Sequence, residues 1–464
     1  MRFACRITVL AAVLTGLLVP AAAGTGALAA ASASPAPAGG TELWLDRYAP
    51  PGGGGATAIA VSPDGARVYV TGKKTTAFAA ATGKLLWVSP AGPGQTVATQ
   101  VAVSADGARV FVTGTQTLAS GASQYATVAY NAATGARLWQ ANYGPVTALS
   151  DASAIGVSPD GSTVFVTGKS EIVSGNTSSY RYATMAYDAA TGARRWTARC
   201  CRGGLAEAVS LAVSPDGARV YVTGVGISPA GSATYATVAY DAATGAVLWD
   251  RRYVEGGTDA FARSVVASPD GSRVYVTGEA GGTDGVDDTT VAYLAASGTQ
   301  LWVAHHDLSS VSGPVGMAIS KNGTELVLTG ADSAGPSGSG GYGYRTVAYR
   351  TSDGHQLWAR FYQGPGGGGL PASVAMSPDG SKVFVTGVAG AGSPRAGRAD
   401  YGTVAYGAAT GAQLWASVYS GPLYNGTDEA AAVAVSPDGS KVFVTGGSPE
   451  PSGIISYATL AYQA

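Results

Sequence analysis

Histidine is the first side chain whose position in this sequence suggests chemistry, because two histidines and an aspartate follow one another at His305, His306 and Asp307. Neighbouring residues on a strand point to opposite faces of a sheet, so adjacent histidines seldom bind one metal ion together. The remaining histidine, His355, stands alone. The sequence contains no recognisable Ser-His-Asp set, HExxH motif, phosphate-binding loop or CxxC motif. We therefore predict no catalytic residues and no metal ligands, and we assign no cofactor-binding residue.

Acidic residues are the second set of candidates, since several stand just before short apolar segments. These acids are Asp151, Glu207, Asp259 and Asp428. Their carboxylates could ring a central channel, or they could cap turns by accepting backbone N–H groups, which is the interpretation we favour. A calcium site would need several oxygen ligands, and the best local cluster for one is a single loop with three aspartates. That loop holds Asp284, Asp287 and Asp288.

A turn that recurs eight times indicates which elements position these side chains. Segments of the form Ser-Pro-Asp-Gly, or a close variant, begin at Ser62, Ser104, Ser158, Ser214, Ser268, Ser320, Ser377 and Ser436. Proline at the second position suits a type I turn and glycine suits the fourth, so each segment should close a β-hairpin. A second turn, such as 241–245 (Asp-Ala-Ala-Thr-Gly), precedes a strand that carries tryptophan. The period of roughly fifty residues predicts units of four antiparallel strands.

All eight tryptophans fall at one position of the repeat. They are Trp44, Trp87, Trp139, Trp196, Trp249, Trp302, Trp358 and Trp415. A large aromatic side chain in every unit should pack between neighbouring blades. Trp44 lies on a fourth strand without predecessors, and 457–462 forms a third strand without a successor, so the two should complete one blade. We predict an all-β, eight-bladed β-propeller of four-stranded antiparallel blades over residues 41–464, its ring closed by strands from both termini.

The N-terminus and the overall charge bear on location and partners. Arg2 and Arg6 precede the apolar run 7–20 and a cleavage-like triplet at 27–29, which is typical of a signal peptide. We expect a signal peptide over 1–29, a disordered lead-in over 30–40, and a secreted protein without a membrane span. Lys and Arg total 28 against 29 Asp and Glu, and only 12% of residues are charged. Such a chain offers little attraction to nucleic acid, so we expect no nucleic-acid partner, and we expect a monomer.

The connections between the second and third strands differ from copy to copy, whereas the two turns hardly change. The main variable segments are 115–124, 169–181, 225–234, 279–288, 331–344 and 388–400. Because the strands alternate in direction, these connections and those between units should share one face. Variable loops on a fixed scaffold are typical of binding surfaces. We expect any ligand there, near the mouth of the central channel, unless the loops vary without function.

The segment Ala239–Trp249 resembles the tryptophan-docking repeat of the pyrroloquinoline quinone (PQQ) dehydrogenases, in which alanine, aspartate, Thr-Gly and tryptophan hold this spacing. Segments 129–139 and 186–196 match nearly as well. The Ser-Pro-Asp-Gly and Val-Tyr-Val-Thr-Gly segments also look like the YVTN and SBBP-type repeats of secreted bacterial propellers. The resemblance covers nearly the whole mature chain, and it implies the fold more strongly than any activity.

The quinoprotein resemblance implies a role for Cys200 and Cys201, which lie about where those enzymes carry a disulfide between adjacent cysteines against the cofactor. In an exported protein such a pair should oxidise. Adjacent Cα atoms lie about 3.8 Å apart, which is below the usual disulfide range, so the ring would be strained. Arg202 replaces the aspartate that follows the pair in the family, and we can place neither its metal-binding Glu and Asn nor its catalytic Asp. We predict a Cys200–Cys201 disulfide.

Two functions follow from these observations. The first is a secreted, non-catalytic propeller scaffold that binds a protein or a cell-surface glycan through the variable-loop face. The alternative, which the resemblance implies, is a PQQ- and calcium-dependent dehydrogenase of the quinoprotein class, with the cofactor in the same funnel. For the scaffold we expect no cofactor and no enzyme activity, whereas the quinoprotein alternative would require PQQ and calcium.

Overall fold

The computed structural model describes residues 38–90, 95–175, 177–203, 206–256, 258–281, 286–306, 312–332, 342–365, 367–390, 399–423 and 426–464. The predicted signal peptide at 1–29, and the lead-in as far as residue 37, lie outside these ranges. Within the same ranges no helix is long and apolar enough to cross a membrane.

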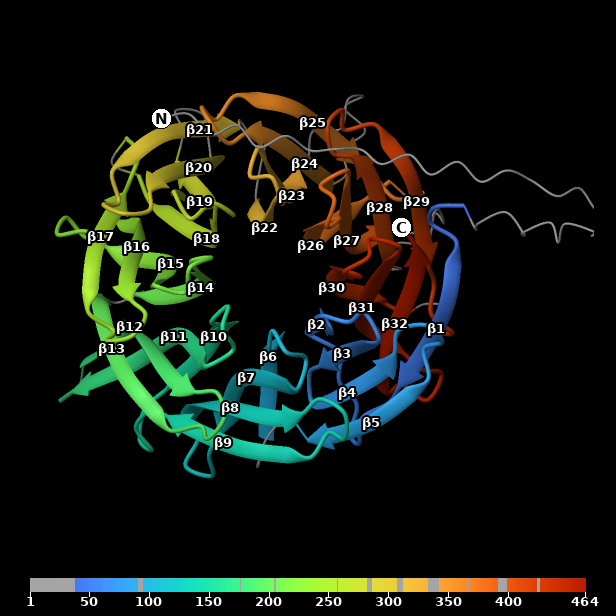
Figure 1. Ribbon diagram of the computed structural model, residues 1–464, viewed down its shortest axis with the longest axis horizontal. Coiled ribbons are helices and arrows are strands. Elements are labelled where there is room, and N and C mark those ends of the chain that lie inside the picture. The colour runs from blue at the N-terminus through green and yellow to red at the C-terminus, as the bar shows by residue number, and fades with distance from the viewer. Residues whose placement is uncertain are drawn as a thin grey trace, which may run out of the picture. The chain divides into compact units, whose positions relative to one another are not determined.

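The described residues from Ala38 onward form eight four-stranded antiparallel sheets around a central axis (Figure 1). Blade 1 comprises β2 (Ala58–Val61), β3 (Arg67–Thr71), β4 (Lys74–Ala79) and β5 (Leu85–Pro90), and blade 2 comprises β6 (Gln95–Val103), β7 (Arg109–Thr117), β8 (Ser123–Asn131) and β9 (Arg137–Tyr143). Blade 3 comprises β10 (Ser150–Val157), β11 (Thr163–Ser174), β12 (Thr177–Asp188) and β13 (Arg194–Gly203), and blade 4 comprises β14 (Glu207–Val213), β15 (Arg219–Ile227), β16 (Ala233–Asp241) and β17 (Val247–Tyr253). Blade 5 comprises β18 (Ala260–Ala267), β19 (Arg273–Gly281), β20 (Val286–Leu294) and β21 (Gln300–His306). Blade 6 comprises β22 (Ser312–Ile319), β23 (Glu325–Asp332), β24 (Gly343–Arg350) and β25 (Gln356–Tyr362), and blade 7 comprises β26 (Gly369–Met376), β27 (Lys382–Gly390), β28 (Ala399–Gly407) and β29 (Gln413–Tyr419). Blade 8 comprises β30 (Glu429–Val435), β31 (Lys441–Pro449), β32 (Ile455–Gln463) and β1 (Glu42–Tyr48).

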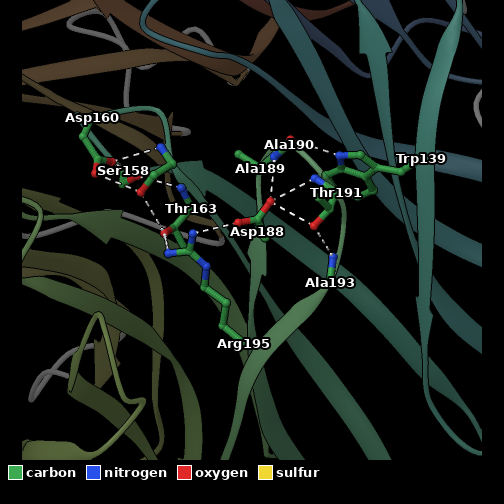
Figure 2. Close-up of polar contacts among 11 residues, drawn as sticks. Trp139, Ser158, Asp160, Thr163, Asp188, Ala189, Ala190, Thr191, Ala193 and Arg195 are labelled. Atoms are coloured by element: carbon green, nitrogen blue, oxygen red, sulfur yellow. Dashed lines mark hydrogen bonds and ion pairs between the residues drawn. The ribbon is translucent and has the colours of Figure 1, made fainter.

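The first turn of each blade is built by hydrogen bonds from its own side chains, as blade 3 illustrates (Figure 2). The Gly161 N–H donates to the Ser158 carbonyl at 2.8 Å, and the Thr163 N–H donates to Ser158 Oγ at 2.9 Å. The Ser162 N–H donates to the Asp160 carboxylate at 3.0 Å. Hydrogen bonds, chiefly from the Ser158 hydroxyl, lower the pKa of Asp160 to about 2. Gly161 has φ +70°, which glycine adopts without strain. The sequence of this turn therefore specifies the predicted hairpin.

The second turn of blades 1 to 7 receives the tryptophan of the preceding blade, as blade 3 illustrates (Figure 2). The Asp188 carboxylate accepts hydrogen bonds from the Thr191 N–H and hydroxyl, both at 2.9 Å. The Trp139 Nε1–H of blade 2 donates to the Ala189 carbonyl at 3.0 Å, and a Cβ on Gly192 would lie 2.6 Å from the indole ring. The same indole bond to the next blade is made by Trp44, Trp87, Trp196, Trp249, Trp302 and Trp358. The prediction that tryptophan packs between blades is confirmed.

Tyrosine at the start of the third strand makes a second link between blades. In six of the eight interfaces its hydroxyl donates to a third-strand carbonyl of the next blade at 3.0–3.4 Å. These tyrosines are Tyr125, Tyr182, Tyr235, Tyr344, Tyr401 and Tyr457. The close approach of the inner strand, with the tyrosine hydroxyl behind it, explains the glycine of the Thr-Gly that ends the second-strand signature: a Cβ on Gly224 would lie 2.0 Å from the Glu207 carbonyl and 2.9 Å from Tyr182 Oη. The apolar core accordingly lies between blades as well as within them.

The ring closes through strands from both termini, as predicted. Strand β1 pairs with β32, where Trp44 lies opposite Ala461. The Gly40 N–H donates to the Gln463 carbonyl at 2.8 Å, just before the pairing begins. Gly40, at φ +80°, lies against the ring of Trp415, as the second-turn glycines lie against the other tryptophans. The N-terminal segment thus supplies the tryptophan contact that a turn supplies in other blades.

Candidate functional site

The connections that vary between copies lie at one end of the blades, because each sheet is antiparallel and the two short turns occupy the other end. The variable connection predicted over 169–181 does join the second and third strands, but most of it continues those strands. Strands β11 and β12 pair from Thr163 with Asp188 to Ser174 with Thr177, so almost the whole segment is a hairpin. β-branched and aromatic residues such as Ile172, Val173 and Tyr180 favour this extension. Parts of the predicted loops 279–288, 331–344 and 388–400 lie outside the described residues.

At this end, the inner-strand residue that precedes the partner of the Thr-Gly glycine, together with its own second-strand partner, forms what we call the rim. In six blades these cross-strand pairs are Val97–Thr115, Asp151–Lys169, Glu207–Val225, Phe261–Glu279, Leu370–Val388 and Glu429–Gly447. Blades 3 to 5 and blade 8 therefore place charged side chains on the rim, whereas blades 2 and 7 place uncharged side chains there. Blades 3 to 5 form a continuous charged sector, and the uncharged positions of blades 2 and 7 are separated by blades 8 and 1.

The charged side chains of this sector form ion pairs within blades 3 and 5 and between blades 3 and 4. Lys169 Nζ lies 3.8 Å from the Asp151 carboxylate of its own blade and 3.4 Å from the Glu207 carboxylate of blade 4. In blade 5 the Arg263 guanidinium lies 2.9 Å from the Glu279 carboxylate. These side chains are partly exposed, so each pair contributes little to stability while leaving charge available to a partner.

The four acids noted in the sequence separate into two groups. Asp259 accepts a hydrogen bond from the Ala233 N–H at 2.7 Å, and Asp428 accepts one from the Gly421 N–H at 2.8 Å. Capping is therefore confirmed for these two. Asp151 and Glu207 instead flank Lys169 on the rim. Asp151 and Glu207 share the rim position, whereas Asp259 and Asp428 lie at other repeat positions, so the four acids do not form a single carboxylate ring.

The proposed calcium cluster is not assembled by the residues that the structure describes. Asp284 lies outside them, and Asp287 and Asp288 are neighbours on β20, so they point to opposite faces. Within the described part of the chain, no three His, Cys, Asp or Glu side chains are grouped to hold a metal.

The two adjacent histidines also face opposite ways. His305 Nδ1 lies 3.3 Å from a Glu255 carboxylate oxygen in blade 4, while His306 Nδ1 lies 3.0 Å from Gln356 Oε1 in blade 6. The prediction that they do not share a ligand agrees with this arrangement.

The most unusual polar residues of the described structure lie between blades 5 and 6. Asp288 occupies the third-strand position that carries tyrosine in six other blades, and only 1% of its surface is exposed. Both carboxylate oxygens are buried, and neither accepts a hydrogen bond from the described residues. Burial, followed by the neighbouring Glu279 charge, raises the pKa of Asp288 well above its ordinary value. This interface lacks the tyrosine link.

Arg345 of blade 6 faces this interface. In other blades, the residue at this position offers its carbonyl to the tyrosine hydroxyl of the preceding blade. The positive charge of Arg345 lowers the pKa of Asp288, but burial raises that pKa by more. The Arg345 guanidinium forms an ion pair with the fully buried Asp332 and lies 6.0 Å above the Phe361 ring. Charged groups thus replace a neutral hydrogen bond here. The sequence contained the signal, because the third strand of blade 5 reads Asp-Thr-Thr-Val-Ala-Tyr where other copies begin with tyrosine.

Cys200 and Cys201 lie on β13, the outermost strand of blade 3 (Figure 1). The structure joins their sulfur atoms, with the Cα atoms 3.8 Å apart. Both residues are half-buried against the next blade, away from the inner strands that surround the axis. The quinoprotein resemblance implied a pair that faces a cofactor in the central funnel, and this position does not fit that role.

The comparisons with known proteins agree with this architecture. The family described as outer membrane protein assembly factor BamB matches residues 32–183, 124–290 and 183–400. BamB from Moraxella catarrhalis shares 14% identity, with 91% of this chain and 99% of that chain covered, at a TM-score of 0.51. The C-terminal WD40 domain of Sif2 shares 11% identity, with 92% and 99% covered, at a TM-score of 0.56. Both structures support the fold alone.

No curated protein sequence matches the chain. The family match spans more than half of the sequence, from residue 32 to residue 400. This chain is therefore a member of the family of PQQ-repeat β-propellers described as outer membrane protein assembly factor BamB.

Proposed function

We propose that this chain is an exported, non-catalytic scaffold that binds a protein partner through its variable-loop face. The observation that carries the proposal is the exposure of apolar side chains at the loop end of the blades. Val97, Val315 and Leu370, at or next to the rim, expose 58%, 42% and 49% of their surface. Exposed aliphatic side chains such as Leu248 and Leu357 also lie at the opposite end, but they recur there at one repeat position, just before the tryptophan. The exposed apolar side chains of the loop face belong to single blades, and together with the variable loops they support an interaction surface.

The neighbouring charged sector suits the same role. Apolar contacts supply most of the energy of a protein interface, while charged groups at its edge select the partner and orient it. Val97 and Leu370 would provide the first contribution, and Lys169 and Arg263 the second. The family match to BamB, an assembly factor by its description, agrees with a scaffold role.

A protein partner is favoured over a glycan by the kind of side chain that is exposed. Sugar rings commonly stack on exposed aromatic side chains. Among the large hydrophobic residues exposed in the described structure, Tyr342 is the single aromatic, and the others are aliphatic. Aliphatic side chains suit a protein surface better.

Site-specific photocrosslinking in the producing cells tests the proposal. A photoreactive phenylalanine analogue would replace Val97 or Leu370 on the loop face, and Ala133, exposed in a second turn at the opposite end, as the matched control. We expect a discrete crosslinked protein from the two rim positions and none from Ala133. Equal crosslinking from both ends, or none from either, would contradict the proposal.

The quinoprotein alternative stays a prediction that a separate measurement tests. The purified protein would be mixed with PQQ and calcium, then examined for stoichiometric cofactor absorbance and for dye reduction with alcohols or sugars. The position of Cys200 and Cys201 on an outer strand leads us to expect neither. Bound cofactor with dye reduction would favour the enzyme over the scaffold.

A further inference from the structure

The adjacent cysteines occupy a position that is structural in other blades. In five blades the fourth strand ends in a tyrosine whose ring packs against the third-strand tyrosine, with centroids 5.2–5.6 Å apart. These tyrosines are Tyr48, Tyr143, Tyr253, Tyr362 and Tyr419. In blade 3 the residue opposite Tyr182 is Cys200. A packing residue has thus been replaced by a reactive one, with a second cysteine beside it.

Each sulfur atom of the pair receives a different hydrogen-bond donor from blade 4. The Tyr240 hydroxyl lies 3.3 Å from Cys200 Sγ, and Arg252 Nη2 lies 3.3 Å from Cys201 Sγ. Burial raises the pKa of Tyr240, so its phenol remains a neutral donor. Arg252 also pairs with Asp250 on its own strand, and burial raises the pKa of that carboxyl. The cationic donor therefore faces Cys201, and the neutral donor faces Cys200.

The backbone adds a second asymmetry. Cys201 has φ +59°, and it is the only non-glycine residue in the described part of the chain with positive φ. An L-residue in this left-handed region is strained. Breaking the bond between the two sulfurs would free Cys201 to return to an extended conformation. The strand that carries it, β13, leads directly to β14 and to Glu207 on the rim.

We propose that Cys200 and Cys201 form a thiol–disulfide exchange site whose substrate is a protein dithiol. A thiolate of the dithiol attacks Cys200 Sγ, the Cys200–Cys201 bond breaks, and its electron pair leaves on Cys201 Sγ. The second thiol of the dithiol then displaces Cys200 from the mixed disulfide. Two electrons and two protons pass to the cysteine pair, and the dithiol becomes a disulfide. Cys201 is the leaving sulfur because the Arg252 guanidinium stabilises its thiolate.

Differential alkylation of the purified full chain tests this site. Iodoacetamide would be added before and after brief exposure to dithiothreitol, and peptide mass mapping would separate Cys200 and Cys201 from Cys5. We expect no alkylation of the pair without reductant. After reduction near neutral pH, we expect Cys201 to react roughly tenfold faster than Cys200, as a thiol pKa lower by about one unit would produce.

Two variants separate the charge effect from a merely structural one. Arg252→Gln should raise the pH midpoint for alkylation of Cys201 and remove most of the rate difference. Arg251→Gln is the matched control, because the neighbouring Arg251 donates instead to the carbonyls of Gly298 and Ser297, at 2.8 and 2.7 Å. Free thiols before reduction, a pair that dithiothreitol does not reduce, or equal rates in the wild-type protein would each overturn the proposal. The wild-type rates decide the question even if a variant does not fold.

Discussion

Two neighbouring interfaces between blades are linked by different side chains at the same repeat position. Between blades 4 and 5, the Tyr235 hydroxyl donates to the Thr289 carbonyl at 3.1 Å, and its ring packs against Tyr253. Between blades 5 and 6, Asp288 stands in place of the tyrosine and faces Arg345. In the first interface, a neutral hydroxyl finds a hydrogen-bond acceptor on the next blade. In the second, the buried Asp288 carboxylate receives no hydrogen bond from the described residues and lies near the positive charge of Arg345.

The difference shows what the repeat does and does not specify. A tyrosine link needs only a backbone carbonyl on the neighbouring blade, so any copy can follow any other. A charged interface works only when the acid and the base are present together, which makes blades 5 and 6 a matched pair. Buried charges that depend on one another are costly to separate. The following changes should therefore affect the two interfaces unequally.

Arg345→Ala should have the largest effect. It would leave Asp332 and Asp288 buried without their cation, and breaking a buried pair by removing one partner costs about 3–5 kcal/mol. Urea unfolding at neutral pH would measure the loss. Arg263→Ala is the control, because that arginine pairs with Glu279 in an exposed setting, where about 0–1 kcal/mol is expected. Equal effects of the two substitutions would mean that the blade 5–6 interface is not special.

Asp288→Asn should change how stability depends on pH. The pKa of Asp288 is raised in the folded state, so the folded protein holds this proton more tightly than the unfolded chain. The contribution of Asp288 is fully present below its unfolded pKa, and it is lost as pH rises toward the folded value. The variant should lose less stability between pH 4 and pH 8 than the wild type, with a difference of about 1–3 kcal/mol at the upper end.

Unfolding curves at several pH values would test this expectation. A stability profile of Asp288→Asn that runs parallel to that of the wild type would show that the carboxyl is not the titrating group. Asp259→Asn serves as the control, since that acid is exposed and caps a turn.

Tyr235→Phe should have a smaller effect, because it removes one neutral hydrogen bond and retains the ring. The Thr289 carbonyl keeps a second donor, the Thr277 hydroxyl at 3.4 Å, so it is not left without a partner. We expect a loss of about 1 kcal/mol in the free energy of unfolding. Tyr342→Phe, at an exposed tyrosine, should cost nothing measurable. A loss as large as that of Arg345→Ala would remove the distinction between the two interfaces.

Most of the fold could be predicted because the sequence repeats it eight times. The turn at Ser158 and the one at Asp188 each contain the side chains that build them, so local sequence was sufficient. Ring closure followed from the unpaired strands around Trp44 and Tyr457. The extended hairpin over 169–181 was not predicted. Serine, glycine and asparagine near its tip favour a loop, whereas the β-branched residues on either side favour the strands that form.

The charged interface was not predicted, although its signal was in the sequence. Considered within its own loop, Asp288 stood out only as part of the best local cluster of acids for a calcium site. Aligning the third strands of all blades would have placed Asp288 at the tyrosine position and Cys200 at the fourth-strand tyrosine position. What the alignment could not supply is the partner, since Arg345 and Asp332 meet Asp288 only through contacts between blades. Departures from the repeat are therefore the residues to examine first, and their partners come from the structure.

Lys169→Gln should have the smallest effect on stability, and it completes the comparison between buried and exposed charge. Lys169 links blades 3 and 4 through Asp151 and Glu207, as Arg345 lies between blades 5 and 6, but all three rim side chains are partly exposed. Water and salt screen these pairs, so the loss should stay below about 1 kcal/mol and shrink further in high salt. The variant should nevertheless weaken crosslinking at Leu370 if the charged sector orients the partner. A stability loss comparable to that of Arg345→Ala, measured by the same urea unfolding, would show that the rim serves the ring rather than a partner.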